Sequence, residues 1–283
     1  MTNQSTAKRI KSGIYHLRVT YLERIRHDLK ILFKPTKKPV VNFLVCGVQR
    51  GGTTALDHYL RQHSQICMAS KKEVHYFDIE YNFRYDNIFY SKYHSFFDPQ
   101  PEHNIVGEAT PLYIYWRYAT RRIWEYNPKM KLIILLRNPI QRAYSHWNLN
   151  RERGDENLPF WEAIHIEEER KQQTRPYQDR TFSYLDRGFY SEQLRRISSY
   201  FSAEQILLIK SEDLEDTPQS EANRVFKFLN VTQYKIQEKK KINAEKYQKE
   251  MTSREKNYLN DFYSLEIQTL EKTLGWDLSD WNK

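Results

Sequence analysis

The sequence predicts an α/β protein in which a parallel β-sheet is sandwiched between α-helices. An apolar run over Val41–Cys46 leads into a glycine-bearing turn, Gly47–Thr54, and a helical pattern follows. A second apolar run, Lys131–Leu136, has no polar interruption, which is typical of a strand buried on both faces. Strand-like and helix-like patterns alternate over residues 40–231. That alternation favours parallel strands joined by helices.

The turn after the first strand has the chemistry of an anion-binding site. Strand, turn and helix N-terminus present successive backbone N–H groups and the positive end of a helix dipole. The spacing Gly47-x4-Gly52 is that of a phosphate loop, so we predict a sheet of the P-loop type. Thr53-Thr54 stands where a nucleotide triphosphatase carries Lys-Ser/Thr, and the cation comes earlier, at Arg50. That shift argues against ordinary ATP chemistry.

A second candidate anion site follows the second apolar run. Asn138 is a natural N-cap and Pro139 a natural first helical residue, so a helix is predicted to start there. Arg137 and Ser145 then offer a guanidinium and a hydroxyl at the carboxyl end of a strand, where doubly wound sheets bind ligands. Arg142 shares a helix face with Ser145 and fits either this site or a surface ion pair. Two such sites predict one ligand with two separated phosphate-like groups.

Two further strands are predicted, one near Glu73–Phe77 and one over Gln205–Lys210. Residues 81–101 are aromatic without clean periodicity and are expected to form an irregular loop. Thr252-x-x-Glu255 is a capping box that opens a C-terminal helix ending at Gly275. This helix is predicted to pack on the sheet. Its apolar stripe would consist of Tyr258, Leu259, Phe262, Leu265 and Leu270.

Composition and charge divide the chain into two parts. Among the 283 residues, 39% are hydrophobic and 14% aromatic, which is enough for a core. The net charge is +9, but residues 1–38 carry ten Lys and Arg against two acidic residues, so the remainder is nearly neutral. We therefore predict a basic arm over 1–38 and one domain over 39–283. Because that domain has no charge excess of its own, we expect no nucleic-acid partner.

The basic arm has apolar residues at helical spacing and is predicted to be an amphipathic helix. Such a helix can lie on an anionic membrane, pack on the folded domain, extend into solvent or serve as a transit peptide. Cys46 and Cys67 give no disulfide framework, and no apolar stretch reaches transmembrane length. The expected location is the cytoplasm, and the basic arm makes peripheral contact with the inner face of the membrane a second expectation.

Four sequence blocks together resemble a known family. Gly47–Thr54 resembles the 5′-phosphosulfate loop of sulfotransferases that use 3′-phosphoadenosine 5′-phosphosulfate (PAPS), and Arg137–Ser145 resembles their 3′-phosphate site. Lys72–Asp78 is similar to the segment that carries the catalytic base in the heparan-type carbohydrate branch. Tyr184–Tyr190, followed by Leu194, is similar to a further block of that branch. The blocks occur in family order.

The resemblance implies transfer of a sulfuryl group from PAPS to a hydroxyl, with no metal ion required. Glu73 would be the catalytic base and His75 an assistant or substrate contact. Arg50 would stabilise the leaving group, where the family commonly has Lys. The implied donor-binding residues are Arg50, Gly51, Gly52, Thr53, Thr54, Arg137 and Ser145.

The acceptor and two rival functions stay open. In the block Glu108–Tyr113, many heparan-type relatives have Lys after the Glu, whereas this chain has Ala109, which weakens the case for a heparan-like acceptor. We expect a carbohydrate or glycolipid hydroxyl. The rivals are a small-molecule P-loop kinase and a non-catalytic nucleotide-binding, membrane-docking protein. Lys239–Lys241 would be either a loop that closes over the donor or a solvated charge run.

Overall fold

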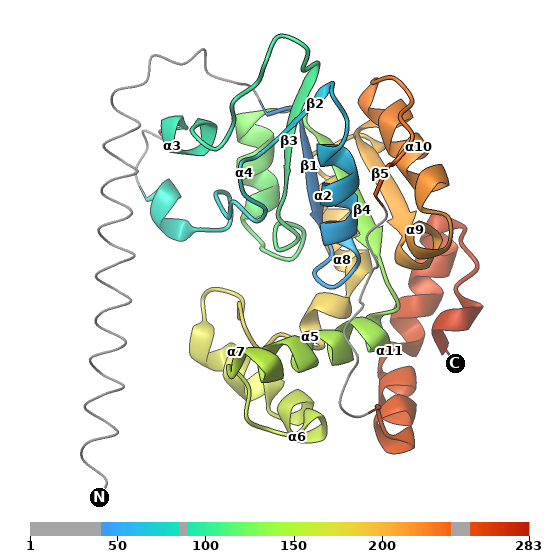
Figure 1. Cartoon of the computed structure of the whole chain (residues 1–283). Coiled ribbons are helices and arrows are strands. Elements are labelled where there is room, and N and C mark those ends of the chain that lie inside the picture. The colour runs from blue at the N-terminus through green and yellow to red at the C-terminus, as the bar shows by residue number, and fades with distance from the viewer. Residues whose placement is uncertain (1–40, 85–89, 239–249, 283) are drawn as a thin grey trace, which may run out of the picture.

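The computed structural model describes residues 41–84, 90–238 and 250–282 (Figure 1). These residues form one parallel five-stranded sheet in the order β2-β3-β1-β4-β5. The strands are β1 (Phe43–Gly47), β2 (Ile66–Met68), β3 (Ile105–Ala109), β4 (Lys131–Leu136) and β5 (Ile206–Lys210). The predicted α/β class with a sheet between helices is confirmed. The predicted basic arm and the Lys239–Lys241 segment lie outside the described residues.

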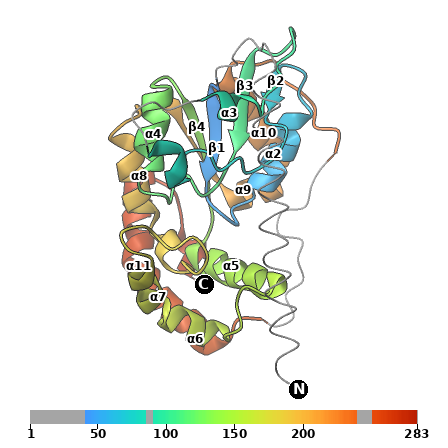
Figure 2. The ribbon, with the colours of Figure 1, turned by 90° about the vertical axis from the view of Figure 1, so that its left-hand side faces the viewer.

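Helices cover both faces of the sheet. In Figure 2, α2 and α10 lie on one side of the strands, and α4 and α8 lie on the other. The α-helices are α2 (Thr53–Arg61), α3 (Ser91–His94), α4 (Ala119–Tyr126), α5 (Pro139–Arg153), α6 (Phe160–His165), α7 (Glu167–Thr174), α8 (Tyr190–Ser198), α9 (Ser211–Asp216), α10 (Pro218–Leu229) and α11 (Ser253–Leu274). The short 3₁₀ helices are η1 (Glu80–Phe83), η2 (Asp186–Gly188), η3 (Ala203–Gln205) and η4 (Ser279–Asn282).

The central strands are apolar throughout because each face of the sheet has its own core. In β4, Leu132 and Ile134 belong to the cluster that includes Ile123 of α4. Ile133 and Leu135 belong to the cluster on the other face. Successive side chains of a strand point to opposite faces, so an uninterrupted apolar run suits a strand covered on both sides. The run predicted as a strand over residues 131–136 is confirmed to the residue.

The strand predicted near Glu73–Phe77 is wrong. This segment is a loop in which Glu73 and His75 have positive φ values of 61° and 54°. Left-handed residues cannot continue a strand, and they are uncommon in any residue but glycine. The sheet instead takes β2 and β3, which the sequence did not predict as strands, and the strand predicted from Gln205 begins one residue later. The irregular loop predicted over 81–101 contains the end of η1 and all of α3 among its described residues.

Both predicted helix starts are confirmed. The Asn138 side chain accepts hydrogen bonds from the backbone N–H groups of Ile140 and Gln141, with Pro139 at the first helical position of α5. Thr252 and Glu255 form the predicted reciprocal capping box of α11. These caps satisfy amide groups that have no acceptor within their own helix.

The packing predicted for the C-terminal helix is wrong in part. Helix α11 does end at left-handed Gly275, but it packs against α5, α8 and η4 rather than on the sheet. Of the predicted stripe, Phe262 is 37% and Leu265 is 73% exposed. The buried face consists of Leu259, Tyr263, Glu266, Ile267 and Leu270. No helix among the described residues is both long and apolar enough to cross a bilayer.

Candidate active site

The turn between β1 and α2 is anchored by residues that follow β4 and β5, the two strands beyond β1 in the sheet order. Arg137, at the end of β4, donates from Nη1 to the Arg50 carbonyl over 3.0 Å. Ser211, after β5, donates from Oγ to the Gly51 carbonyl over 3.0 Å. Because the N–H of a peptide unit points opposite to its carbonyl, anchoring the Gly51 carbonyl directs the Gly52 N–H the other way. The loop is therefore preorganised with amide hydrogens on one side.

Three of the predicted loop amides are suited to an anion, and one is already used. The N–H of Gly51 donates to the Val48 carbonyl over 3.0 Å. Gly52 has φ 91°, which glycine adopts without steric cost, and it precedes the first turn of α2. Thr53 and Thr54 lie in that turn, where their amides have no acceptor within the helix. The anion site thus centres on residues 52–54.

Gly51 is required by close packing. A Cβ on this residue would lie 2.9 Å from the Val48 side chain and 3.0 Å from the Leu135 carbonyl oxygen. The turn therefore sits directly on the end of β4, which is the strand that leads to Arg137. That contact brings the two predicted anion sites together.

Arg50 joins the two sites. It has φ 68°, and its Nε donates to Ser145 Oγ over 2.8 Å. Ser145 lies one to two turns into α5 and is fully buried, so its hydroxyl faces the loop rather than bulk water. The predicted donor residues Arg50, Arg137 and Ser145 thus form one connected group at the carboxyl ends of β1 and β4.

Arg142 and Tyr190 are buried next to this group, and each donates a hydrogen bond to a backbone carbonyl. Arg142 is fully buried, and its Nη2 donates to the Tyr184 carbonyl. The surface ion pair considered for Arg142 is therefore wrong: the helix face that carries Ser145 points inward. Tyr190 is also fully buried and donates its hydroxyl to the Arg137 carbonyl over 3.0 Å. Tyr190 is thus a packing residue that fixes the backbone at Arg137.

The predicted base, Glu73, lies in a cluster of charged side chains. Lys72 Nζ lies 2.7 Å from Glu73 Oε1, and His75 Nε2 lies 3.4 Å from Glu73 Oε2. The other ring nitrogen of His75 lies 2.7 Å from Asp78 Oδ2. Asp78 is buried and also binds Arg180, whose Nη2 lies 2.6 Å from the same oxygen. The sequence paired Glu73 with His75 through a strand, whereas a left-handed loop brings them together.

These contacts set opposite shifts on the two candidate catalytic groups. Burial acts to raise the pKa of Glu73, but the hydrogen bond from His75 and the charge of Lys72 outweigh it and lower the pKa to about 2. Burial acts to lower the pKa of His75, but its hydrogen bonds to Asp78 and Glu73 raise the pKa to about 9. At neutral pH the cluster therefore holds a carboxylate at residue 73 and an imidazolium at residue 75.

Glu73 and Gln49, a residue of the candidate donor loop Gly47–Thr54, line the same cavity, whereas residues 50–54, Arg137 and Ser145 are not part of its lining. This catalytic cavity, as we name it, has a volume of about 320 Å³. Its lining includes Gln49 of the loop, Glu73 and His75. The other lining residues are Ile79, Pro111, Leu112, Arg153, Arg180 and Arg187. Within the described residues, Arg153 is an exposed cation that forms no ion pair. The cavity thus combines an ionised carboxylate with an arginine free to meet a ligand.

Arg187 connects the catalytic cavity to the donor loop. It is buried, and it donates to the Gln49 side chain, to Ser183 Oγ over 2.7 Å and to the Arg180 carbonyl over 2.6 Å. Burial lowers its pKa to about 10. Arg187 lies in the block Tyr184–Tyr190, but no role was predicted for it.

Asp78, Arg153 and Arg180 are further site residues without a predicted role. Asp78 lies three residues after His75 and closes the block that resembles the base segment, which was the available signal. Arg153 ends α5, two turns beyond Ser145 on the same helix. Arg180 reaches Asp78 across 102 residues of sequence, so only the tertiary structure reveals the pair.

The buried carboxyl group of Glu108 has a structural environment. It accepts hydrogen bonds from Thr110 Oγ1 at 2.6 Å, Tyr113 OH at 2.8 Å and Tyr93 OH at 3.1 Å. Burial raises its pKa despite these contacts. Ala109, which stands where many relatives have Lys, is itself buried. Among residues 41–84, 90–238 and 250–282, no three His, Cys, Asp or Glu side chains group as metal ligands do.

Comparison with known proteins agrees with this geometry. The model of the sulfotransferase domain matches residues 41–273. Heparan sulfate glucosamine 3-O-sulfotransferase 5 of Mus musculus is 30% identical over 200 residues, covering 68% of this chain and 55% of that protein. Membrane-associated sulfotransferase kil1 of Dictyostelium discoideum is 37% identical over 109 residues, covering 38% of this chain and 23% of that protein. This chain matches about half or less of the length of these curated relatives.

Solved structures show the same fold. A sulfotransferase from Alicyclobacillus acidocaldarius superposes with a TM-score of 0.74 at 28% identity, covering 86% of this chain and 99% of that chain. Mouse sulfotransferase SULT7A1, complexed with PAP, superposes with a TM-score of 0.52 at 9% identity, covering 81% of this chain and 85% of that chain. Because the family match spans residues 41–273, which include both candidate anion-binding turns and the Glu73 loop, the chain belongs to the sulfotransferase domain family.

Proposed function

We propose that this chain transfers a sulfuryl group from PAPS to a hydroxyl of a carbohydrate or glycolipid. The observation that carries the proposal is the catalytic cavity, which is lined by Gln49 of the donor loop and by the Glu73 carboxylate. Family membership and the PAP complex of the structural neighbour support the choice of donor. The heparan sulfate relatives support a carbohydrate acceptor.

Donor binding would use the two anion sites. The amides of residues 52–54 and the α2 dipole would hold the 5′-phosphosulfate. Arg137 and Ser145 would hold the 3′-phosphate through a charge-assisted contact and a hydroxyl. The hydrogen bond from Arg50 to Ser145 supports a position of Arg50 between the two sites, where its guanidinium would neutralise charge on the leaving phosphate.

The reaction would be an in-line displacement. The acceptor oxygen forms a bond to sulfur as the bond from sulfur to the phosphate oxygen breaks, and the acceptor proton passes to Glu73. His75 and Lys72 keep Glu73 ionised before transfer, and Asp78 orients the His75 ring. Because Arg50, the backbone amides and the helix dipole can balance the developing charge, we propose that no metal ion is needed.

Titration with 3′-phosphoadenosine 5′-phosphate (PAP), the desulfated donor, tests the donor assignment. Calorimetry should show binding of PAP much tighter than of adenosine 5′-phosphate, since only PAP fills the site at Arg137 and Ser145. Equal binding of the two nucleotides would refute the assignment. Magnesium-dependent turnover of ATP would instead support a small-molecule kinase.

Replacement of Glu73 tests the base. Glu73→Gln keeps the shape of the side chain but removes its proton-accepting oxygen, so turnover with PAPS should be lost while PAP affinity stays near the wild-type value. Glu215→Gln, on a residue of α9 that does not line the catalytic cavity, is the matched control. An active Glu73→Gln protein would place the base elsewhere. An inactive wild-type protein that still binds PAP would favour the non-catalytic alternative.

We also propose a cytoplasmic location with peripheral membrane contact through residues 1–38. The support is their basic, amphipathic sequence and the similarity of the chain to the membrane-associated sulfotransferase kil1. Sedimentation with anionic liposomes should depend on residues 1–38 and weaken with salt. Equal sedimentation of the full chain and of a chain lacking 1–38 would refute this contact.

A further inference from the structure

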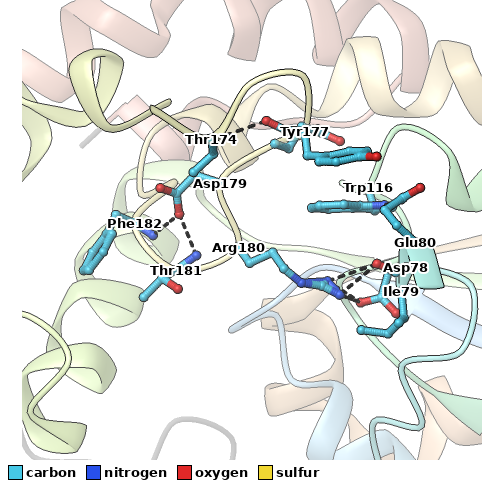
Figure 3. A pocket seen from close by; sticks show the side chains of 11 residues that line it. Asp78, Ile79, Glu80, Trp116, Thr174, Tyr177, Asp179, Arg180, Thr181 and Phe182 are labelled. Atoms are coloured by element: carbon cyan, nitrogen blue, oxygen red, sulfur yellow. Dashed lines mark hydrogen bonds and ion pairs between the residues drawn. The ribbon is translucent and has the colours of Figure 1, made fainter. Parts of the chain in front are cut away.

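A second and larger cavity adjoins the catalytic cavity. Its volume is about 530 Å³, within the ~300–1,000 Å³ typical of small-ligand sites. Figure 3 shows it between the loop over residues 174–182 and the side chains of Ile79, Glu80 and Trp116. Ile79 and Arg180 line both cavities. A ligand longer than one ring can therefore extend from Glu73 into the second cavity.

One wall of the second cavity is aromatic. Tyr177 is 43% exposed and lies nearly parallel to Trp116, with ring centroids 6.2 Å apart and planes 17° apart. Trp116 is fixed by a hydrogen bond from Nε1 to Glu80 Oε1 at 2.8 Å and by the Arg180 guanidinium, 4.6 Å from its ring centre. The rigid stack presents an apolar, polarisable surface of the kind that packs against the C–H face of a sugar ring.

The loop that encloses the second cavity is anchored at several points. Gln178 accepts a hydrogen bond from the Arg117 N–H and donates to the Tyr115 carbonyl over 2.7 Å. The Arg180 carbonyl accepts from Arg187 over 2.6 Å. Asp179 Oδ1 accepts the backbone N–H groups of two following loop residues at 2.6 Å. Because these contacts exist without a ligand, binding requires little ordering of the loop.

The charges in the second cavity disfavour an anion. Among the described residues, Arg180 is the only Lys or Arg in its lining, and Asp78 already binds it through two nitrogens. Glu80, whose carboxylate pairs with Arg122 outside the lining, and Asp179 also line the cavity. An anionic ring would meet these carboxylates with no unpaired cation, and an uncompensated buried charge is costly. Asp78 Oδ1 is buried without a hydrogen-bond partner among the described residues, so the polarity of this wall is not spent on a cation.

From this arrangement we propose that the second cavity binds a neutral sugar ring of the acceptor, next to the ring whose hydroxyl faces Glu73. The inference rests on the proposed function and narrows it: the acceptor is an oligosaccharide or glycan chain with an uncharged ring at this position. A carboxylate or sulfate group elsewhere on the acceptor would pair with Arg153 in the catalytic cavity instead.

A glycan array tests the inference with the full chain loaded with PAP. The array carries neutral oligosaccharides of two to four rings and matched oligosaccharides in which every ring bears a carboxylate or a sulfate. Wild-type protein should bind neutral or partly charged chains and not the fully charged ones. Tyr177→Ala should weaken that binding about five- to tenfold, the scale of one lost aromatic contact, and Tyr177→Phe should retain it.

Tyr200→Ala is the matched control, because Tyr200 is 37% exposed, packs at a tilt against Trp124 and lines neither cavity. Its binding should equal that of the wild type. Preference for the fully charged chains, equal loss in the two alanine variants, or no glycan binding would overturn the inference. PAP affinity, measured on the same samples, separates the two proposals: unchanged PAP binding with a failed array refutes the second cavity alone, and absent PAP binding refutes the donor assignment.

Discussion

Arg50 Nε donates a hydrogen bond to Ser145 Oγ over 2.8 Å, which joins two turns that lie 95 residues apart in the sequence. The contact is possible because β1 and β4 are adjacent parallel strands whose carboxyl ends meet at one edge of the sheet. A side chain from the first anion site thus reaches the hydroxyl of the second. In the donor complex this guanidinium would lie between two phosphate groups, where its charge serves both.

Replacing Arg50 should separate catalysis from donor binding. Arg50→Ala removes the cation nearest to the leaving phosphate, so kcat should fall about 10²–10³-fold, as when a preorganised electrostatic contact is lost. Arg50→Lys restores the charge and should recover much of kcat. Steady-state rates at saturating PAPS measure both. A kcat for Arg50→Ala within threefold of the wild type would show that the backbone amides alone stabilise the leaving group.

Arg137→Ala should weaken PAP binding by about 1.5–3 kcal/mol, the worth of a hydrogen bond to a charged group. The substitution also frees the Arg50 carbonyl, which Arg137 holds at 3.0 Å, so the loop loses one anchor. Calorimetry with PAP and with adenosine 5′-phosphate distinguishes these effects. A loss limited to PAP locates Arg137 at the 3′-phosphate, whereas equal loss for both nucleotides would assign it a purely structural role.

The N-cap of α5 should contribute to global stability, since this helix carries Ser145. Asn138→Ala removes the acceptor for two backbone amides and also the donor to the Trp281 carbonyl at 3.0 Å. We expect a loss of about 0.5–2 kcal/mol from the cap alone. Asn138→Asp keeps the cap and removes only the amide donor, so it should lose less. Urea denaturation measures both variants, and equal losses would show that the Trp281 contact dominates.

The strands with complete local signals could be predicted from sequence. Residues 131–136 are apolar at every position after Lys131, because both faces of β4 are covered. Strand β3 was missed because Gly107 and Glu108 interrupt its apolar pattern. Glu108 is tolerated there only because three hydroxyl groups, two of them from tyrosines, converge on its carboxyl group. Such compensation comes from the tertiary structure and leaves no periodic signal.

The candidate site, too, could be predicted from sequence only where its signals are local. The two candidate anion turns were predictable from glycine spacing and from helix-capping residues, which act locally. The Glu73 cluster does not: the sequence placed Glu73 and His75 on one face of a strand, but they meet through two left-handed residues. Asp78 and Arg180 complete the cluster from opposite ends of a long separation. The second cavity was not predicted because its loop is positioned by contacts such as those of Gln178.

Stability should depend on pH through the two shifted groups beside Asp78. The pKa of Glu73 falls from 4.5 to about 2 on folding, so its contribution is complete above pH 4.5 and is lost as the pH falls towards 2. The pKa of His75 rises from 6.5 to about 9, so its contribution is complete below pH 6.5 and is lost as the pH rises through 9. The cluster should therefore stabilise the fold most between about pH 4.5 and 6.5.

His75→Gln tests the alkaline limb of this dependence. Urea denaturation at pH 6 and at pH 9.5 should show a larger loss for the wild type than for the variant, because the variant has no imidazolium to deprotonate. His103→Gln, on a histidine outside both cavities and not in contact with Glu73, should behave as the wild type. Parallel losses in wild type and His75→Gln would mean that folding does not raise the pKa of His75.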